Sequence, residues 1–215
     1  VSGAGRFDCG SFGVSPAEAG AMDPQQRLLL ERGYEALHGA GLDREALMGS
    51  VTGVFVGIAA NDFAQVLQAM PAGSSVYAAT GSAHSIAAGR LSYELGLQGA
   101  CVAYDTSCSA ALVAGHAALR SAQQSECTTA LLASVNVMLA PGVGWSFALA
   151  GMTSLLGRSR TFDERADGYA RAEACGGASL RRDGAGEAAG PLPLELCGCS
   201  VRQDGRSASL TAPNG

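Results

Sequence analysis

The sequence predicts an α/β fold in three layers, with a mixed sheet between helices. Apolar segments of strand length alternate along the chain with segments of helical periodicity, which is typical of layered α/β domains. The first helices also begin with recognisable capping sequences. The composition agrees with a packed core, since 47% of the 215 residues are hydrophobic and 15% are charged.

The first part of the chain contains two helix starts and a strand. Ser15–Glu18 is a capping box with proline at the first helical position, and Asp23–Gln26 repeats the arrangement. The second helix is expected to end near Gly39 and Gly41. Thr52–Ile58 is a nearly continuous apolar run, as expected for a strand that is covered on both faces.

Two further helices are expected before the central part of the chain. One is capped by Asn61 or Asp62 and ends before a loop at 71–75. The other covers about Ser85–Leu95, and Gly96 ends it.

Residues 100–119 join a strand to a helix through a sharp turn. The first five are short and apolar, as in a buried strand, and the next three favour turns and caps. Helical spacing begins at Ser109, so Cys108 lies where the strand turns into the helix. A second apolar strand follows over Thr128–Val137. The order strand, helix, strand implies that the two strands are parallel and joined by a right-handed crossover.

The last part of the chain is predicted to contain loops and two strands. Residues 140–170 contain Pro141, several glycines and the polar run Arg158–Asp167, and are expected to be rich in loops. Cys175–Arg181 and Leu192–Val201 have the character of strands, separated by a hairpin-like link at Asp183–Gly186. The chain stops within a loop, Thr211–Gly215, and we interpret residues 1–215 as one incomplete domain.

Cys108 is the candidate nucleophile. Unpaired backbone N–H groups and the positive end of the helix dipole meet at a helix start, and both favour a thiolate over a thiol. Strand, turn, nucleophile and helix in this order expose one reactive atom in several unrelated folds. The alternative is that Cys108 is a small, buried and inert side chain.

A cysteine nucleophile normally works with a base, most often histidine, and the chain has three histidines. His116 lies eight residues after Cys108 on the same helix, about 12 Å of rise away, so it cannot reach the thiol. His38 is expected to be solvated, and His84 to act in capping or hydrogen bonding. The residues alone therefore predict a poised thiol without a base.

Composition argues against several other classes of protein. The chain has no lysine, which excludes lysine Schiff-base chemistry. Its net charge of −5, without a basic run, argues against a nucleic-acid surface. No charged residue occurs between Glu126 and Arg158, but polar residues, glycine and proline interrupt this segment, so we reject a membrane span.

The seven cysteines form no Cys-x-x-Cys pair, and no metal site is expected. Cys197 and Cys199 are interpreted as packing residues of a strand, with zinc binding as a remote alternative. Free thiols indicate a reducing compartment, so we expect the protein to be located in the cytoplasm.

Several motifs occur together in a characteristic order. The central one is Asp105-Thr106-Ser107-Cys108-Ser109. The others are, in chain order, Phe7–Pro16, Ala21–Glu31, Gly53–Gly57, Gly89–Tyr93, Thr161–Asp163, Ala166–Tyr169 and Leu210–Gly215. With these motifs the chain resembles the amino-terminal half of a β-ketoacyl synthase domain from a type I polyketide synthase or a fatty acid synthase.

The resemblance implies a thiolase-like layered fold and assigns the nucleophile to Cys108. It implies that Cys108 accepts an acyl chain, as a thioester, from the phosphopantetheine of an acyl carrier protein. A malonyl-type extender would then lose carbon dioxide, and its carbanion would attack that thioester. The Cys108 backbone N–H would supply one oxyanion hydrogen bond. No cofactor is expected to bind the chain directly.

The resemblance covers the front half of such a domain. The two catalytic histidine motifs of the family and its glycine-rich loop lie beyond Gly215, so the isolated fragment is expected to be inactive in condensation. The sequence departs from the family at Ser107, where alanine is usual, and at Leu155 and Leu156, where Pro-Asp is usual. Because Cys108 is retained, a decarboxylating variant with glutamine at that site is excluded.

The resemblance also implies partners, namely an acyl carrier protein, the missing half or other synthase domains, and a second copy. The strand at Cys101–Tyr104 is expected near the two-fold axis of a homodimer, since so apolar a strand seldom ends at an open edge. The alternative function is a non-catalytic piece that only packs or dimerises. A cysteine hydrolase is a more distant possibility, because it too needs a histidine. The native sequence after Gly215 distinguishes the first two.

Overall fold

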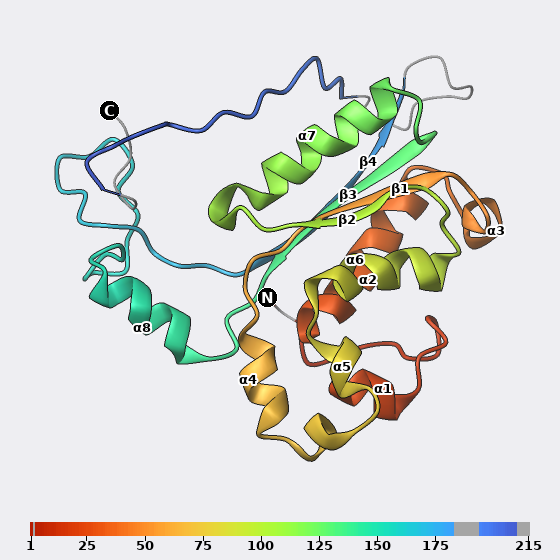
Figure 1. The fold of residues 1–215 in the computed structure, drawn as a ribbon, viewed down its shortest axis with the longest axis horizontal. Coiled ribbons are helices and arrows are strands. Elements are labelled where there is room, and N and C mark those ends of the chain that lie inside the picture. Colours follow the sequence, from red (N-terminus) through yellow and green to blue (C-terminus); the bar gives the residue numbers. More distant parts are fainter. Residues whose placement is uncertain (2, 183–193, 210–215) are drawn as a thin grey trace.

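A mixed sheet of four strands, with helices on both faces, forms the centre of the chain as the structure describes it (Figure 1). The structure is a computed structural model that describes residues 1, 3–182 and 194–209. The strands are Thr52–Gly57 (β1), Cys101–Tyr104 (β2), Thr129–Asn136 (β3) and Ala174–Arg181 (β4), in the spatial order β2-β1-β3-β4. β1 is parallel to β2 and to β3, whereas β4 is antiparallel to β3. The structure confirms the predicted α/β class and the mixed sheet. It also confirms that the strands before and after the helix that follows Cys108 are parallel.

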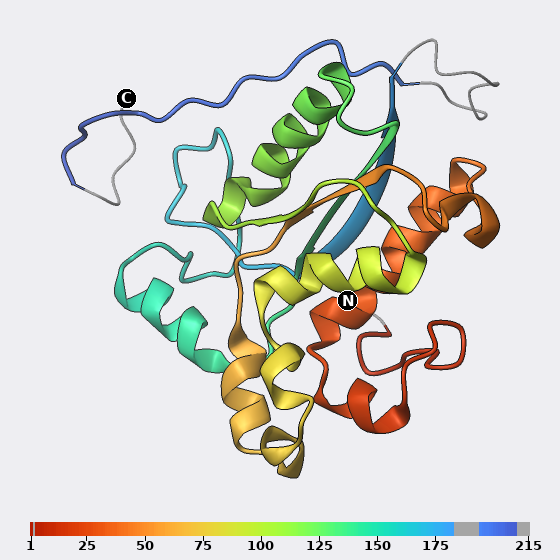
Figure 2. The same ribbon diagram turned by 45° about the vertical axis from the view of Figure 1, so that its right-hand side comes forward.

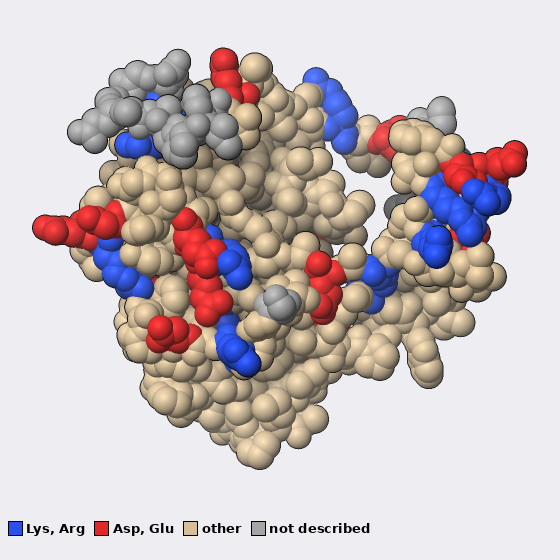
Figure 3. Space-filling model, turned by 180° about the vertical axis from the view of Figure 1, so that it is seen from behind, with Lys and Arg blue, Asp and Glu red and all other residues tan. Residues whose placement is uncertain are grey.

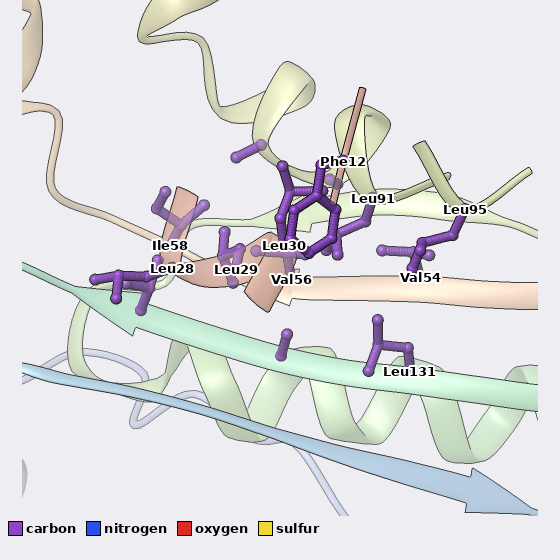
Figure 4. Close-up of a cluster of buried hydrophobic side chains, with 14 of the residues drawn as sticks. Phe12, Leu28, Leu29, Leu30, Val54, Val56, Ile58, Leu91, Leu95 and Leu131 are labelled. Atoms are coloured by element: carbon purple, nitrogen blue, oxygen red, sulfur yellow. The ribbon is translucent and has the colours of Figure 1, made fainter. Parts of the chain in front are cut away.

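One face of the sheet is covered by helices α2 (Pro24–Gly39) and α6 (His84–Leu95). Alternate residues of a strand point to opposite faces, so every second side chain of β1 and β3 turns towards these helices. The buried cluster that results includes Leu28, Leu29, Leu30, Val54, Val56, Leu91, Leu95 and Leu131 (Figure 4). Burying one such side chain contributes about 1.5–3 kcal/mol, so this layer holds much of the apolar stabilisation.

The other face is covered by helix α7 (Ala110–Gln123), as Figure 2 shows. The buried face of α7 is made mostly of alanines, with one glycine and one serine, and Ala114 and Ala118 are fully buried against Phe55 and Ala130. Such small side chains let a helix lie close to a sheet. The predicted three layers are therefore present, with α7 alone forming one of them among the described elements.

Shorter helices connect the layers, and the first of them begins as the sequence predicts. They are α1 (Pro16–Ala21), α3 (Arg44–Leu47), α4 (Asp62–Gln68), α5 (Ala78–Gly81) and α8 (Pro141–Leu149). Ser15 Oγ accepts a hydrogen bond from Glu18 N–H at 3.2 Å, and Asp23 Oδ1 accepts one from Gln25 N–H at 2.8 Å. Both predicted caps are confirmed.

In the later part of the chain, one prediction holds in part and another is wrong. Residues 140–170 were expected to be rich in loops, and most of 150–170 is irregular, but α8 occupies the beginning of this segment, because Pro141 at the first helical position starts a helix despite the glycines that follow. Residues 194–201 form no strand and run beside α7 as an extended segment, with Leu194 almost fully exposed (Figures 1 and 2). Residues 192 and 193, the link Asp183–Gly186 and the end at 211–215 lie outside the described residues.

None of the helices within the described residues is long and apolar enough to cross a membrane.

Candidate functional site

Cys108 lies in a sharp turn between the end of β2 and the start of α7. The turn is a short 3₁₀ segment, Ser107–Ser109, and the thiol is exposed. The predicted position at a helix start is therefore confirmed. The alternative that Cys108 is a buried side chain is wrong.

The residues around Cys108 hold this turn with their own side chains. Asp105 Oδ1 accepts a hydrogen bond from Ser107 N–H at 3.1 Å, and Ser109 Oγ donates to Thr106 O at 2.9 Å. Ser107 has a φ of 56°, in the left-handed region that costs a residue with a side chain about 1–2 kcal/mol. The polar residues of the motif thus stabilise a backbone conformation that would otherwise be unfavourable.

A glycine at the end of β1 allows the turn to lie where it does. A Cβ atom added to Gly57 would lie 2.6 Å from Ala111 N and 2.7 Å from Ala110 C. Both are backbone atoms, which cannot swing aside as a flexible side chain can. The Ile58 N–H also donates to Tyr104 O at 3.0 Å, so the ends of β1 and β2 are joined just before the turn. The sequence analysis includes Gly57 in the motif Gly53–Gly57 but does not predict this contact, because a glycine at a strand end has many causes.

The backbone of the turn leaves one N–H group free beside the thiol. The N–H of Ser109 is bonded to Thr106 O, and that of Ala110 to Ser107 O. No residue in the described part of the chain accepts a hydrogen bond from Cys108 N–H. A free donor at this place is suited to an oxyanion that forms next to the sulfur.

The three histidines are placed much as the sequence predicts. His84 Nε2 lies 3.3 Å from Ala60 O, a hydrogen bond that agrees with its predicted role. His38 is exposed and its ring lies 5.8 Å from that of Tyr34, while His116 is half-buried on α7. None of the three forms a hydrogen bond with Cys108 Sγ, so the described residues bring no base to the thiol.

The other cysteines have different surroundings. Cys101 and Cys197 are exposed, Cys127 is buried, and the remaining three are intermediate. Burial raises the pKa of the Cys175 thiol to about 11. The exposed Cys197 does not pack as a strand residue, and this sequence-based interpretation is wrong because residues 194–201 are not a strand.

Cys108 does not line either of two hollows in the surface. One, of about 670 Å³, is lined by Arg158, Arg160 and Arg165 among others, and Arg165 is already paired with Asp163 at 2.7 Å. The other, of about 610 Å³, contains Arg44, whose guanidinium lies over two aromatic rings. Arginine and acidic side chains are interspersed on the face drawn in Figure 3.

Comparison with known families identifies the family of this chain. Residues 1–185 match the family described as the N-terminal domain of β-ketoacyl synthase. The chain belongs to the β-ketoacyl synthase family. The resemblance predicted from the motifs is therefore confirmed.

The curated relatives of this β-ketoacyl synthase chain are large polyketide synthases. Polyketide synthase GfsB of Streptomyces halstedii is 46% identical over 213 residues, which are 99% of this chain and 4% of that protein. Erythronolide synthase EryA3 of Saccharopolyspora erythraea is 44% identical over 216 residues, or 100% of this chain and 7% of that protein. The chain thus spans a small part of these relatives.

Solved structures that resemble this chain include ketosynthases. The ketosynthase from module 6 of the bacillaene synthase of Bacillus subtilis 168 superposes with a TM-score of 0.78 at 33% sequence identity. The match covers 85% of this chain and 31% of that one. The chain therefore folds as a part of the thiolase-like ketosynthase fold, as predicted.

The high pKa of Cys175 predicts a distinct pH dependence of alkylation. Because only the thiolate reacts, raising the pH from 8 to 10 should speed the reaction of Cys175 with iodoacetamide about 100-fold, whereas free cysteine, with a pKa of about 8.5, gains about 4-fold. Mass spectrometry at several times gives both rates, with free cysteine as the reference. Equal gains at Cys175 and free cysteine would contradict the effect of burial.

Proposed function

We propose that Cys108 is the nucleophile of a ketosynthase that performs decarboxylative condensation during polyketide assembly. The observation that carries the proposal is an exposed thiol beside a backbone N–H that has no acceptor among the described residues, at the start of α7, in a chain of the β-ketoacyl synthase family. The domain to which residues 1–215 belong extends, in this proposal, beyond them.

The reaction has two steps at Cys108. First, Sγ attacks the carbonyl of an acyl thioester on the phosphopantetheine of an acyl carrier protein, and the carrier thiol leaves with the proton that Cys108 gives up. Second, a malonyl-type extender loses carbon dioxide, and the electron pair of the broken C–C bond attacks the acyl carbonyl. The new C–C bond forms, the C–S bond to Cys108 breaks, and Cys108 leaves as a thiolate that takes a proton from water.

The Cys108 N–H supports both steps as an oxyanion donor. Each step passes through a tetrahedral oxyanion next to Sγ, and losing one such donor typically slows an enzyme by about 10²–10³-fold. The enolate of the extender needs further donors, which the three histidines of this chain do not offer, because none of them matches the two histidine motifs of the family. We assign those donors to other parts of the synthase, so residues 1–215 alone should form no β-ketoacyl product.

A second copy of the domain is proposed to pair along β2. This strand lies at the edge of the described sheet, and its residues Cys101 and Val102 are exposed. An open edge presents unpaired N–H and C=O groups that another strand can satisfy. The acyl carrier protein and other domains of a cytoplasmic synthase are the remaining partners, and no directly bound cofactor is part of the proposal.

A non-catalytic packing role is the second candidate. It is favoured by large apolar side chains that stand exposed in the described residues, among them Leu112, Trp145, Leu155 and Phe162. Exposed apolar side chains of this size indicate a contact with another part of the synthase, and this contact does not require that the thiol reacts. The acylation experiment below separates the two candidates.

Acylation of Cys108 tests the proposed function directly. The complete synthase should gain the mass of the acyl group on the Cys108 peptide after incubation with an acyl-carrier thioester, and Cys108→Ala should abolish both this and the β-ketoacyl product. Cys101→Ala, which removes another exposed thiol, should retain both activities. Product formation by a folded Cys108→Ala synthase would exclude the nucleophile and leave the packing role.

The proposed dimer predicts an effect of charge on β2. Val102→Asp should convert a dimeric ketosynthase domain into a monomer in light scattering, because buried unpaired carboxylates are costly. Val76→Asp, at a side chain that is 87% exposed, is the matched control and should stay dimeric. A Val102→Asp domain that remains dimeric would place the interface elsewhere.

A further inference from the structure

The segment between β3 and α8 is held by side chains from elsewhere in the chain. We name residues 137–140 the clamp segment. Each of its four backbone N–H groups donates a hydrogen bond to a side chain and not to a neighbouring strand. Because backbone N–H groups must find partners when they are buried, these side chains determine where the segment lies.

Asp62 and Glu173 hold three of these N–H groups. Asp62 Oδ2 accepts from Leu139 N–H at 3.1 Å and from Ala140 N–H at 3.3 Å. Glu173 Oε1 accepts from Met138 N–H at 2.9 Å. Asp62 is 2% exposed, so water does not compete for these bonds. Hydrogen bonds to a charged acceptor are about twice as strong as neutral ones.

Gln25 holds the fourth N–H group and links it to two other segments. Its Oε1 accepts from Val137 N–H at 3.1 Å, while its Nε2 donates to Ala60 O at 2.9 Å and to Asp23 Oδ2 at 3.2 Å. The side chain is fully buried. One amide therefore joins the start of α2, the loop after β1 and the end of β3. It needs both an acceptor and donors, and no other side chain of similar shape has both.

The clamp segment leads directly into α8, at the edge of the sheet where Cys108 lies. β1, β2 and β3 are parallel, so the turn at Cys108, the loop before α4 and the clamp segment all follow carboxyl ends of strands (Figures 1 and 2). The side chains of α8 are apolar with one exception, and Trp145 and Leu149 are largely exposed. An apolar helix at this edge is suited to an acyl chain carried on Cys108.

We propose that Gln25 and Asp62 are positioning residues, which hold α8 so that its apolar side chains select the acyl chains that Cys108 accepts. This inference rests on the proposed acylation of Cys108. Neither residue touches the reacting atoms. Both act through the backbone of the clamp segment.

The test compares two acyl chains in the complete synthase. The measured quantity is the ratio of Cys108 acylation rates with octanoyl and acetyl thioesters of the carrier. Asp62→Leu and Gln25→Met remove the acceptors of the clamp, and each should change this ratio by about 10-fold or more, because a shift of about 1 Å in a substrate-positioning element can cost 10²-fold. Asp62→Asn keeps an acceptor and should stay within about 3-fold of the native ratio.

A merely structural role gives a different result. If the two residues only help the chain to fold, both rates should fall together and the ratio should stay native, which would overturn the proposal. Failure of both Asp62→Leu and Gln25→Met to fold would overturn it as well. Glu35→Gln, at an exposed ion pair with Arg32, is the control for an unrelated charge change. Absence of any Cys108-dependent acylation in the native synthase would contradict the proposed function instead.

Discussion

At Gly57 the backbone at the end of β1 touches the backbone at the start of α7. A single added carbon would come within 2.6 Å of Ala111 N, and neither partner could relieve the contact by rotating a side chain. The distance from the sheet to the first turn of α7 therefore depends on the absence of one atom. Because Cys108 lies two residues before that turn, the position of the thiol depends on it too. The alanine face of α7 continues the same close approach along the sheet.

Around this contact, polar side chains fix the loops that share the edge of the sheet. Asp105 and Ser109 shape the turn itself, and Gln25 and Asp62 hold the segment that leads to α8. The apolar layers explain why the chain packs, but they do not determine where these loops lie. Buried hydrogen bonds do so, because a buried polar group without its partner costs about 1–3 kcal/mol. The same edge thus combines a rigid sheet, an exposed thiol and an apolar helix.

Local signals explain which parts of this arrangement could be predicted. The caps at Ser15 and Asp23, the apolar run of β1 and the turn at Cys108 depend on residues close in sequence, and each lies where expected. Helix α8 was missed because its glycines resemble those of a loop. The clamp was missed because Gln25 and Val137 are 112 residues apart, and Asp62 and Leu139 are 77 apart. From the sequence Asp62 is a candidate helix cap, but no side chain caps α4, and only the fold reveals that Asp62 binds the clamp segment.

The claim that Gly57 sets the position of the thiol is tested most directly by adding the missing carbon. Gly57→Ala in the complete synthase should leave a folded protein whose Cys108 is acylated about 100-fold more slowly, as expected for a misplaced reacting group. Gly115→Ala is the matched control, since its added carbon would meet only the flexible end of Leu132 at 3.2 Å, and its rate should remain close to native. Native acylation of folded Gly57→Ala would contradict the account.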